Sequence, residues 1–578
     1  MLHLENPRQM PWTLKRKYQE ILSREKGLPV RSGSAGINIC LAYPNFYRTG
    51  MSNLGFQTVY NLFNSQPGVC CERVFLPDPP DEEKLLQGGA SLCSLESHRP
   101  LSDFDILAFS ISFEGDYPNI LKILRMGRIS LERMDRPESE PLILGGGVAV
   151  TLNPEPLGNF FDLFLIGEGE ELVPEFVARY LQCNPGFSAQ NDTREGRCSR
   201  EDLLITLQRE VAGVYVPGFY GPDQTNPPRL VPLHPGMPAR IRRRWISDPD
   251  SHITEECIHP AEAEFGDMYL LEVNRGCGRG CRFCAAGYLY RPVRFRSREV
   301  LADSLTRGAR AKGKVGLIGT AVSDHPELVS IGRDILREGG KLGIGSLRMD
   351  RVSAELLQIL KAGGVETIAL APEAGTDRLR EVIKKGIAEE DIRRAVELLI
   401  DHAILNVRLY FMIGLPTETH EDIQGIIELT RKIKLWAREF SGGTRGFKRI
   451  TLSINQFIPK PATPFQWQPL ENISLVKKKL KIIKQALRRE PAIEINHDLP
   501  KWNYIQALLS LGDRQVGALL LAVDRLGGGW PQAIKEGGLD PDCHVYRLKS
   551  YEETLPWEII DHGTARELLI RECEKALS

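Results

Sequence analysis

Residues 272–292 read EVNRGCGRGCRFCAAGYLYRP, and this stretch places Cys277, Cys281 and Cys284 on one glycine-rich loop. Because glycine permits sharp backbone turns, three thiolates on so short a loop can converge on one metal centre. A structural zinc site would need a fourth ligand, normally from a second Cys or His pair, and none follows at a suitable spacing. Three thiolates on a four-iron cluster leave one iron open, which predicts a catalytic centre. Zinc or a set of buried thiols is the alternative.

The apolar run before the cysteines is the first of a series that alternates with helical patterns. The runs are MYLLEVN (268–274), KVGLIGT (314–320), KLGIGSLR (341–348), ETIALAPEAG (366–375), NVRLYFMIGLP (406–416) and RITLSINQFIP (449–459). Repeated strand–helix units without a Rossmann glycine fingerprint predict a curved, partial (β/α)6 barrel of the TIM type. Ligands of such barrels sit at the mouth formed by the carboxyl ends of the strands, where the cysteine loop is expected.

The spacing C-x3-C-x2-C, with the aromatic Phe283 before the third cysteine, resembles the radical S-adenosylmethionine (SAM) superfamily. The resemblance implies that Cys277, Cys281 and Cys284 hold a [4Fe-4S] cluster. It also implies that SAM binds the open iron and is cleaved to a 5′-deoxyadenosyl radical after one-electron reduction. An electron donor such as flavodoxin or ferredoxin is therefore an expected partner. The protein's own part would be to hold the cofactor dry and oriented.

The same resemblance implies SAM contacts at the ends of the next three strands. Gly319 and Thr320 stand where many relatives carry Gly-Gly-Glu, but the Glu is missing, so backbone carbonyls are expected to accept from the SAM amine. Ser346 and Arg348 end the third strand, and Arg348 is expected to pair with the SAM carboxylate. Glu373 ends the fourth strand, from which related enzymes contact the ribose or sulfonium region. A surface ion pair or a helix cap is the alternative for Arg348 and Glu373.

Residues 37–183 alternate short buried-strand patterns with helical patterns and predict a parallel α/β sheet. Glycine-rich segments end two of these strands, LILGGG at 142–147 and GEGEE at 167–171. The segments resemble the Rossmann-like cobalamin (B12)-binding domain that precedes the barrel in one large class of radical SAM enzymes. The D-x-H-x-x-G signature is absent and FSISFEGDYP (109–118) has no histidine, so cobalamin would bind without that axial ligand. A structural domain without a cofactor is the alternative.

The segment YPNFYRTGMSNLGFQ (43–57) is a polar, aromatic loop directly after the first strand, at the edge where open α/β sheets bind ligands. It resembles an uncharacterised family of long radical SAM proteins that also share the two glycine-rich segments and the cysteine motif. A packed turn is the alternative for this loop.

The composition shifts along the chain predict five parts. They are an N-terminal extension (1–36), the Rossmann-like domain (37–183), a Pro-, Arg- and Asp-rich connector (184–265), the radical SAM barrel (266–470) and a mainly helical C-terminal extension (471–578).

The charge balance and the apolar pattern limit the partners. The chain has 578 residues, with 74 Lys and Arg against 75 Asp and Glu, so any RNA contact would have to be local. The N-terminus has no signal-like apolar region, and no run reaches the roughly 18 apolar residues of a membrane span. We therefore expect a soluble cytoplasmic protein with no membrane partner.

These features predict a radical SAM enzyme acting on a small molecule, a protein or RNA. If cobalamin binds, methyl transfer to an unactivated carbon is favoured. The alternative, without cobalamin, is radical modification of tRNA or protein, such as methylthiolation. The segment PKPATPFQW (459–467) resembles the methylthiolating tRNA enzymes. Residues 471–578 do not resemble the small β-barrel RNA-binding domain in which those enzymes end. A non-catalytic iron–sulfur sensor or binding module is the third hypothesis.

Overall fold

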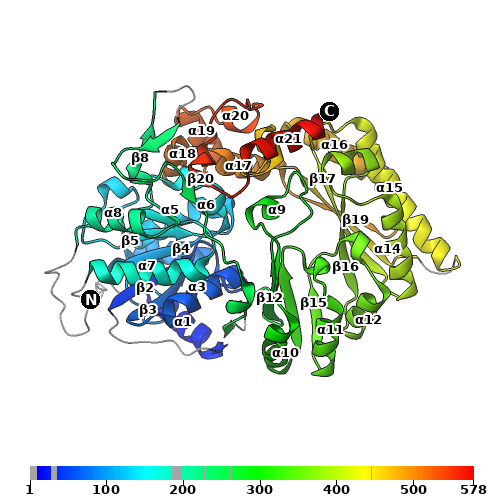
Figure 1. Ribbon diagram of the computed structural model, residues 1–578, viewed down its shortest axis with the longest axis horizontal. Helices are drawn as coiled ribbons and strands as arrows, with labels where there is room; N and C mark the ends of the chain where they lie inside the picture. The colour runs from blue at the N-terminus through cyan, green and yellow to red at the C-terminus, as the bar shows by residue number, and fades with distance from the viewer. Residues whose placement is uncertain (1–9, 28–35, 185–197, 225–228, 261, 444–445) are drawn as a thin grey trace.

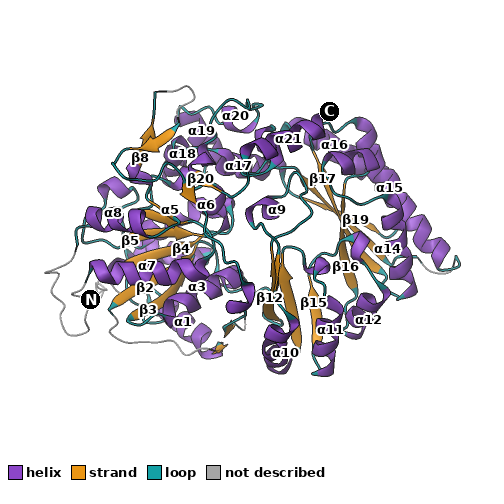
Figure 2. Cartoon of the chain, in the orientation of Figure 1, coloured by secondary structure: helices purple, strands orange, loops and turns teal. Residues whose placement is uncertain are grey.

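The computed structural model describes residues 10–27, 36–184, 198–224, 229–260, 262–443 and 446–578. Figure 1 shows an N-terminal domain in blue and cyan beside a barrel in green and yellow, with the orange and red C-terminal segment lying across the top of both. Helices cover the outer faces of the sheets (Figure 2). Parts of the predicted N-terminal extension (1–9 and 28–35) and of the predicted connector (185–197, 225–228 and 261) lie outside the described residues.

The N-terminal domain is built on a sheet with the order β3-β2-β4-β5-β6-β7. All of its strands are parallel except β7, which is antiparallel to β6. The strands are β2 (Ile37–Tyr43), β3 (Val69–Phe75), β4 (Ile106–Ser110), β5 (Leu142–Gly146), β6 (Leu163–Leu165) and β7 (Val214–Tyr215). Their residues are almost all buried, as expected for parallel strands covered by helices on both faces.

The order of the first strands creates a topological switch point in this sheet. The chain leaves β2 to form β3 on one side and then returns to form β4 on the other side of β2. Helices α3 (Leu54–Ser65), α5 (Tyr117–Met126) and α7 (Gly169–Cys183) follow β2, β4 and β6. Ligands of open α/β sheets bind at such a point, beyond the carboxyl ends of the strands.

The barrel consists of two parallel ladders. The first contains β12 (Tyr269–Arg275), β14 (Lys314–Gly319) and β15 (Lys341–Ile344), and the second contains β16 (Thr367–Glu373), β17 (Asn406–Ile413), β18 (Arg449–Gln456) and β19 (Ile493–His497). A parallel bridge between Leu347 and Leu370 joins the two ladders. The six apolar runs of the sequence are the strands from β12 to β18, apart from the short β13 (Arg294–Phe295), which pairs antiparallel with β12. The predicted α/β fold class is confirmed.

Helices form the outer layer of the barrel. They are α10 (Arg298–Lys312), α11 (Leu328–Arg337), α12 (Ala354–Ala362), α14 (Glu389–Asp401), α15 (His420–Phe440) and α16 (Ile473–Leu487). Their apolar residues pack on the strands in one continuous core. No helix among the described residues is long and apolar enough to cross a membrane.

The C-terminal segment is not only helical, because β19 extends the barrel sheet beside β18. Helices α17 (Pro500–Leu511) and α18 (Gln515–Arg525) then return to the N-terminal domain, where α18 packs on α5. Leu508, Leu509, Leu519 and Leu520 are buried in the same core as the N-terminal strands. The last helix, α21 (Arg566–Leu577), returns to the barrel. This segment therefore bridges the two halves of the molecule.

Candidate functional site

The cysteine loop leaves the end of β12 at the barrel mouth and leads into the short helix α9 (Ala285–Leu289). Gly276 has a φ of 86°, and a Cβ atom there would lie 2.2 Å from the Tyr290 carbonyl oxygen. The Gly276 carbonyl accepts from Asn274 Nδ2 at 3.0 Å and from Thr320 Oγ1 at 2.6 Å. The side chain of Thr320, at the end of β14, thus fixes the first residue of the cysteine loop, Gly276, which is called its root below.

At this mouth Cys281 is buried and Cys277 and Cys284 are half-buried, and none of the three forms a disulfide. Burial raises the pKa of the Cys281 thiol, and it raises that of Cys284 to about 11. The charge of Cys277 contributes to both increases. No three His, Cys, Asp or Glu side chains among the described residues converge tightly enough to hold a single metal ion. Three thiols that interact electrostatically on one short loop fit an iron–sulfur cluster, which takes cysteine thiolates as ligands.

Two of the residues predicted to bind SAM lie beside Cys281 but are paired within the chain. Glu373 Oε1 accepts from the buried Lys385 Nζ at 2.9 Å. Arg348 donates from Nε to Asp350 at 3.0 Å and from Nη2 to the Lys385 carbonyl at 3.0 Å. The positive charges of Lys385 and Arg348 both oppose the rise of the Cys281 pKa. Lys385 lies in the segment IKKGIA, far from the cysteines in sequence, and no local pattern indicated it.

The other predicted contacts are distributed around the mouth. Phe283 packs on an apolar cluster that includes residues of α21. A Cβ atom at Gly319 would lie 2.0 Å from Asn274 Oδ1, so only glycine fits beside β12 at this point. Ser346 is exposed just beyond the end of β15. The roles of these residues toward SAM stay predictions.

The C-terminal helix α21 fastens the cysteine loop from outside the barrel, a contact that sequence reasoning missed. Arg282, between the second and third cysteines, donates from Nε to Glu572 Oε2 at 3.3 Å and from Nη1 to the Val382 carbonyl at 2.7 Å. Lys384 Nζ donates to the same Glu572 oxygen at 2.9 Å. Because Arg282 and Glu572 are both buried, this contact ties α21 to the loop.

A cavity of about 560 Å³ lies between the N-terminal sheet and the barrel. Its wall brings together residues 52–55 at the start of α3, Ser110 and Ser112 at the end of β4, residues 146–147, residues 168–170 at the start of α7, and, from the barrel, residues 274–275 and 318–320. The polar loop and both glycine-rich segments singled out in the sequence therefore meet at the switch point of the sheet. They face Asn274 and Thr320, which hold the root of the cysteine loop.

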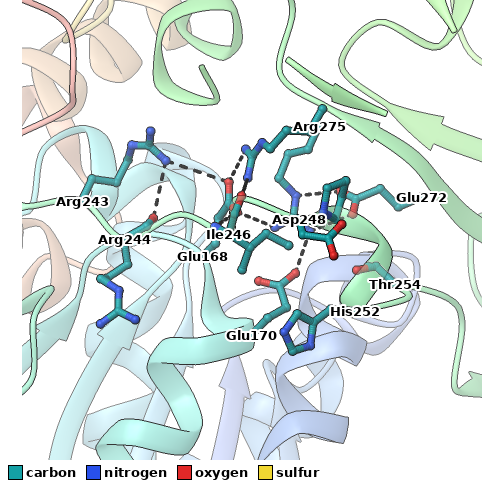
Figure 3. Close-up of polar contacts among 12 residues, drawn as sticks. Glu168, Glu170, Arg243, Arg244, Ile246, Asp248, His252, Thr254, Glu272 and Arg275 are labelled. Carbon is teal, nitrogen blue, oxygen red and sulfur yellow. Dashed lines mark hydrogen bonds and ion pairs between the residues drawn. The ribbon is translucent and has the colours of Figure 1, made fainter. Parts of the chain in front are cut away.

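Buried ion pairs join the two domains along this wall (Figure 3). Glu168, which precedes α7, accepts from Arg294 at 2.7 and 2.8 Å and pairs with Arg275 at 3.1 Å. Arg275 also pairs with Glu170 at 2.7 Å and with Glu272 at 2.8 Å. Burial alone would raise the pKa of Glu168, but the hydrogen bonds from Arg294 and the charge of Arg275 lower it below its ordinary value. The network therefore clamps the N-terminal domain to β12 and β13.

Two protein-family models match the chain. The model described as "Radical SAM proteins, N-terminal" matches residues 55–217, and the model described as "Radical SAM superfamily" matches residues 271–430. The second match begins in β12 and contains the cysteine loop.

Individual proteins are similar to the chain over different lengths. An uncharacterised protein of Methanocaldococcus jannaschii is 30% identical over 487 residues, which cover 84% of this chain and 90% of that protein. The threonylcarbamoyladenosine tRNA methylthiotransferase of Aquifex aeolicus is 26% identical over 185 residues, which cover 29% of this chain and 43% of that enzyme. Among solved structures, the cobalamin-dependent S-adenosylmethionine radical enzyme OxsB aligns with a TM-score of 0.48 and 13% identity, over 94% of this chain and 80% of that one.

Proposed function

The chain belongs to the radical SAM superfamily, whose members use a [4Fe-4S] cluster and SAM, and we propose that it is a methyltransferase that also uses cobalamin, bound in the interdomain cavity. Radical SAM enzymes need a reductant and a substrate. When bound and reduced, the cluster supplies the electron that cleaves SAM into methionine and a 5′-deoxyadenosyl radical. The chain itself must hold the ligands, orient them and exclude water.

The residues at the barrel mouth fit this task. Cys277, Cys281 and Cys284 supply three thiolates, and the nearby positive charges of Lys385 and Arg348 favour the ionised form of Cys281. We assign Gly319, Thr320, Ser346, Arg348 and Glu373, with the packed Phe283, to the SAM site. Arg348 would exchange Asp350 for the SAM carboxylate, and Glu373 would exchange Lys385 for the ribose or sulfonium region. The side chains of Arg348, Glu373 and Lys385 all act on the Cys281 thiol, so both exchanges would take place beside the cysteine loop.

The position of the cavity is the observation that supports the methyltransferase proposal. Methyl transfer to an unactivated carbon needs a radical that removes hydrogen and a methyl donor within reach of one substrate. Cobalamin, when bound, supplies the methyl group. The cavity lies at the topological switch point of the sheet, where such a ligand is expected, and it opens on Asn274 and Thr320, which anchor the cysteine loop.

Cobalamin binding tests the proposal directly. Protein purified anaerobically and reconstituted with iron, sulfide and hydroxocobalamin should retain about four irons and about one cobalamin per chain. With SAM and a reductant it should also form S-adenosylhomocysteine, the product left when SAM gives up its methyl group. Thr58→Trp on α3 fills the cavity and should abolish cobalamin retention, whereas Asn61→Trp, on the exposed side of the same helix, should not.

The similarity to a tRNA methylthiotransferase favours a second candidate, radical modification of RNA without cobalamin. Iron and 5′-deoxyadenosine without any retained cobalamin would contradict the methyltransferase proposal and support this candidate. An iron cluster with bound SAM but no deoxyadenosine after reduction would support a sensor.

A further inference from the structure

Arg243 is a buried guanidinium in the wall of the interdomain cavity. It lies in the connector segment RIRRRW (240–245), and its side chain is only 4% exposed. Nη1 donates to the Arg244 carbonyl at 3.5 Å and Nη2 to the Arg291 carbonyl at 3.1 Å. Its buried Nε has no hydrogen-bond partner among the described residues. The hydrogen bonds of this side chain therefore go to carbonyl oxygens, and its ion pair with Glu168 is a longer contact.

The carboxylates near Arg243 are occupied by other groups. Glu168 Oε1 lies 3.9 Å from Nη1, but Glu168 already binds Arg294 and Arg275. Asp561 contributes negative charge nearby, but its Oδ1 accepts from the Gly563 backbone N–H at 2.9 Å. Figure 3 shows the Arg243 guanidinium at the margin of the ionic network, joined to it by the long contact with Glu168. Burial lowers the pKa of Arg243, and the charge of Glu168 offsets this only in part.

A buried charge is unfavourable unless it is closely paired, so a structural arginine would normally have a carboxylate at hydrogen-bond distance and not at 3.9 Å. The cavity wall also holds the first turns of α3 and α7, whose N-termini carry partial positive charge. The acidic side chains in the first turn of α7, Glu170 and Glu171, are already paired with Arg275 and Arg244. This part of the cavity wall therefore combines the unpartnered Nε of Arg243 with the N-termini of two helices.

We propose that Arg243 and the adjoining cavity wall bind a phosphate group of the molecule that fills the interdomain cavity. The planar guanidinium presents two parallel N–H donors that match phosphate oxygens. The inference rests on the proposed function for the occupant of this cavity, because the phosphate group belongs either to the nucleotide tail of cobalamin or to the substrate. Both sources share the same chemistry at Arg243.

Phosphate binding can be measured without knowledge of the substrate. The melting temperature of the full chain is followed against inorganic phosphate, with chloride holding the ionic strength constant. The control is Arg242→Met, which replaces an exposed neighbouring arginine. The wild type and this control should show the same saturable rise in melting temperature. Arg243→Met should show only the general salt effect, with phosphate affinity at least about tenfold weaker. Because the substitution removes a poorly paired buried charge, its melting temperature without phosphate should be equal to or above that of the wild type.

Cobalamin and cobinamide, which lacks the phosphate-bearing tail, distinguish the two sources. If the phosphate belongs to cobalamin, Arg243→Met should weaken cobalamin binding about tenfold and leave cobinamide binding unchanged. If it belongs to the substrate, both corrinoids should bind the variant as they bind the wild type, while the response to inorganic phosphate is still lost. A wild-type protein that binds neither corrinoid contradicts the proposed function, and the phosphate titration then still tests Arg243 separately.

Equal phosphate responses of the wild type and Arg243→Met would overturn the inference, as would the absence of any saturable response in the wild type. If Arg243→Met does not fold, Arg243→Lys replaces it. This variant keeps the positive charge, so it should fold normally. It loses the bidentate contact of the guanidinium, so it should bind phosphate several-fold more weakly. An Arg243→Lys variant with wild-type phosphate affinity would also overturn the inference.

Discussion

Two glycines flank Cys277, and their surroundings differ. At Gly276 the backbone has a φ of 86°, and a Cβ atom would lie 2.2 Å from the Tyr290 carbonyl oxygen. At Gly278 the nearest atom to such a Cβ would be Val293 Cγ1, at 3.9 Å, which is an ordinary contact. Glycine is therefore required at 276 by geometry, whereas position 278 tolerates a methyl group.

Gly276→Ala should disrupt the root of the cysteine loop, because the added methyl group displaces the 290 backbone and breaks the contacts with Asn274 and Thr320. We expect a loss of unfolding free energy on the order of 2 kcal/mol and of most of the bound iron after reconstitution. Gly278→Ala is the matched control and should stay within about 0.5 kcal/mol of the wild type with full iron. Urea unfolding and iron analysis measure both effects, and equal behaviour of the two variants would refute the geometric explanation.

The sequence predicted the residues whose signal is local and missed those that come from distant segments. The three cysteines stand on one loop, so their spacing alone indicated a metal centre. Arg243, Lys385 and Glu572 approach the site from the connector, from the loop after α13 (Asp377–Val382) and from the last helix. A lysine or an arginine in such a segment has no pattern that distinguishes it from a solvated surface residue.

At the level of elements, α21 stabilises the cysteine loop through Glu572. Its carboxylate binds both Arg282 and Lys384, and Arg282 is buried within the cysteine motif. Glu572→Ala leaves the Arg282 charge buried without that partner, which should cost about 2 kcal/mol of unfolding free energy and accelerate the loss of iron in air. Glu574→Ala, exposed on the same helix, should change neither quantity. An iron-release rate of Glu572→Ala equal to that of Glu574→Ala would contradict a role for α21 at the loop.

The six predicted barrel strands were recognisable because each contains an apolar run with buried residues. The seventh strand, β19, was not recognised, since Ile493–His497 alternates half-buried with exposed residues and none of its residues is buried. Its strand conformation depends on its pairing with β18, a contact between distant segments that local periodicity does not report.

At the scale of the whole molecule, the ion pairs around Glu168 hold the N-terminal domain against the barrel. The pKa of Glu168 in the folded protein is lower than its ordinary value of 4.5. A carboxyl group with a lowered pKa stabilises the fold fully above its ordinary pKa, and this contribution is lost as the pH falls through the lowered value.

The urea midpoint of the wild type should therefore fall as the pH decreases from about 5 toward about 3. Glu168→Gln should start from a lower midpoint at pH 6, because Arg294 loses its charged partner, and should then show a smaller fall. Glu201→Gln, an exposed residue on α8 (Arg200–Glu210), should keep the wild-type pH dependence. A fall in Glu168→Gln as steep as in the wild type would show that other carboxyl groups determine the acid sensitivity.

The cavity is also a property of the whole molecule. The sequence indicated its glycine-rich segments one by one, and the strand order explains why they meet at one edge. The approach of β12 and β14 to that edge depends on the buried interdomain ion pairs and on the C-terminal segment, which packs into the N-terminal core and over the barrel. These contacts join segments hundreds of residues apart and lie beyond the range of sequence patterns.

The formation of 5′-deoxyadenosine from SAM tests the central claim most directly. Three proteins are compared: the wild type, Cys281→Ala, and the control Cys543→Ala, which removes an exposed cysteine. Each is reconstituted anaerobically with iron and sulfide and then reduced in the presence of SAM. We predict deoxyadenosine from the wild type and Cys543→Ala, and a decrease of about two orders of magnitude or more in Cys281→Ala. Undiminished deoxyadenosine in Cys281→Ala, or none from an iron-loaded wild type that binds SAM, would contradict the assignment of the cysteine loop as the catalytic centre.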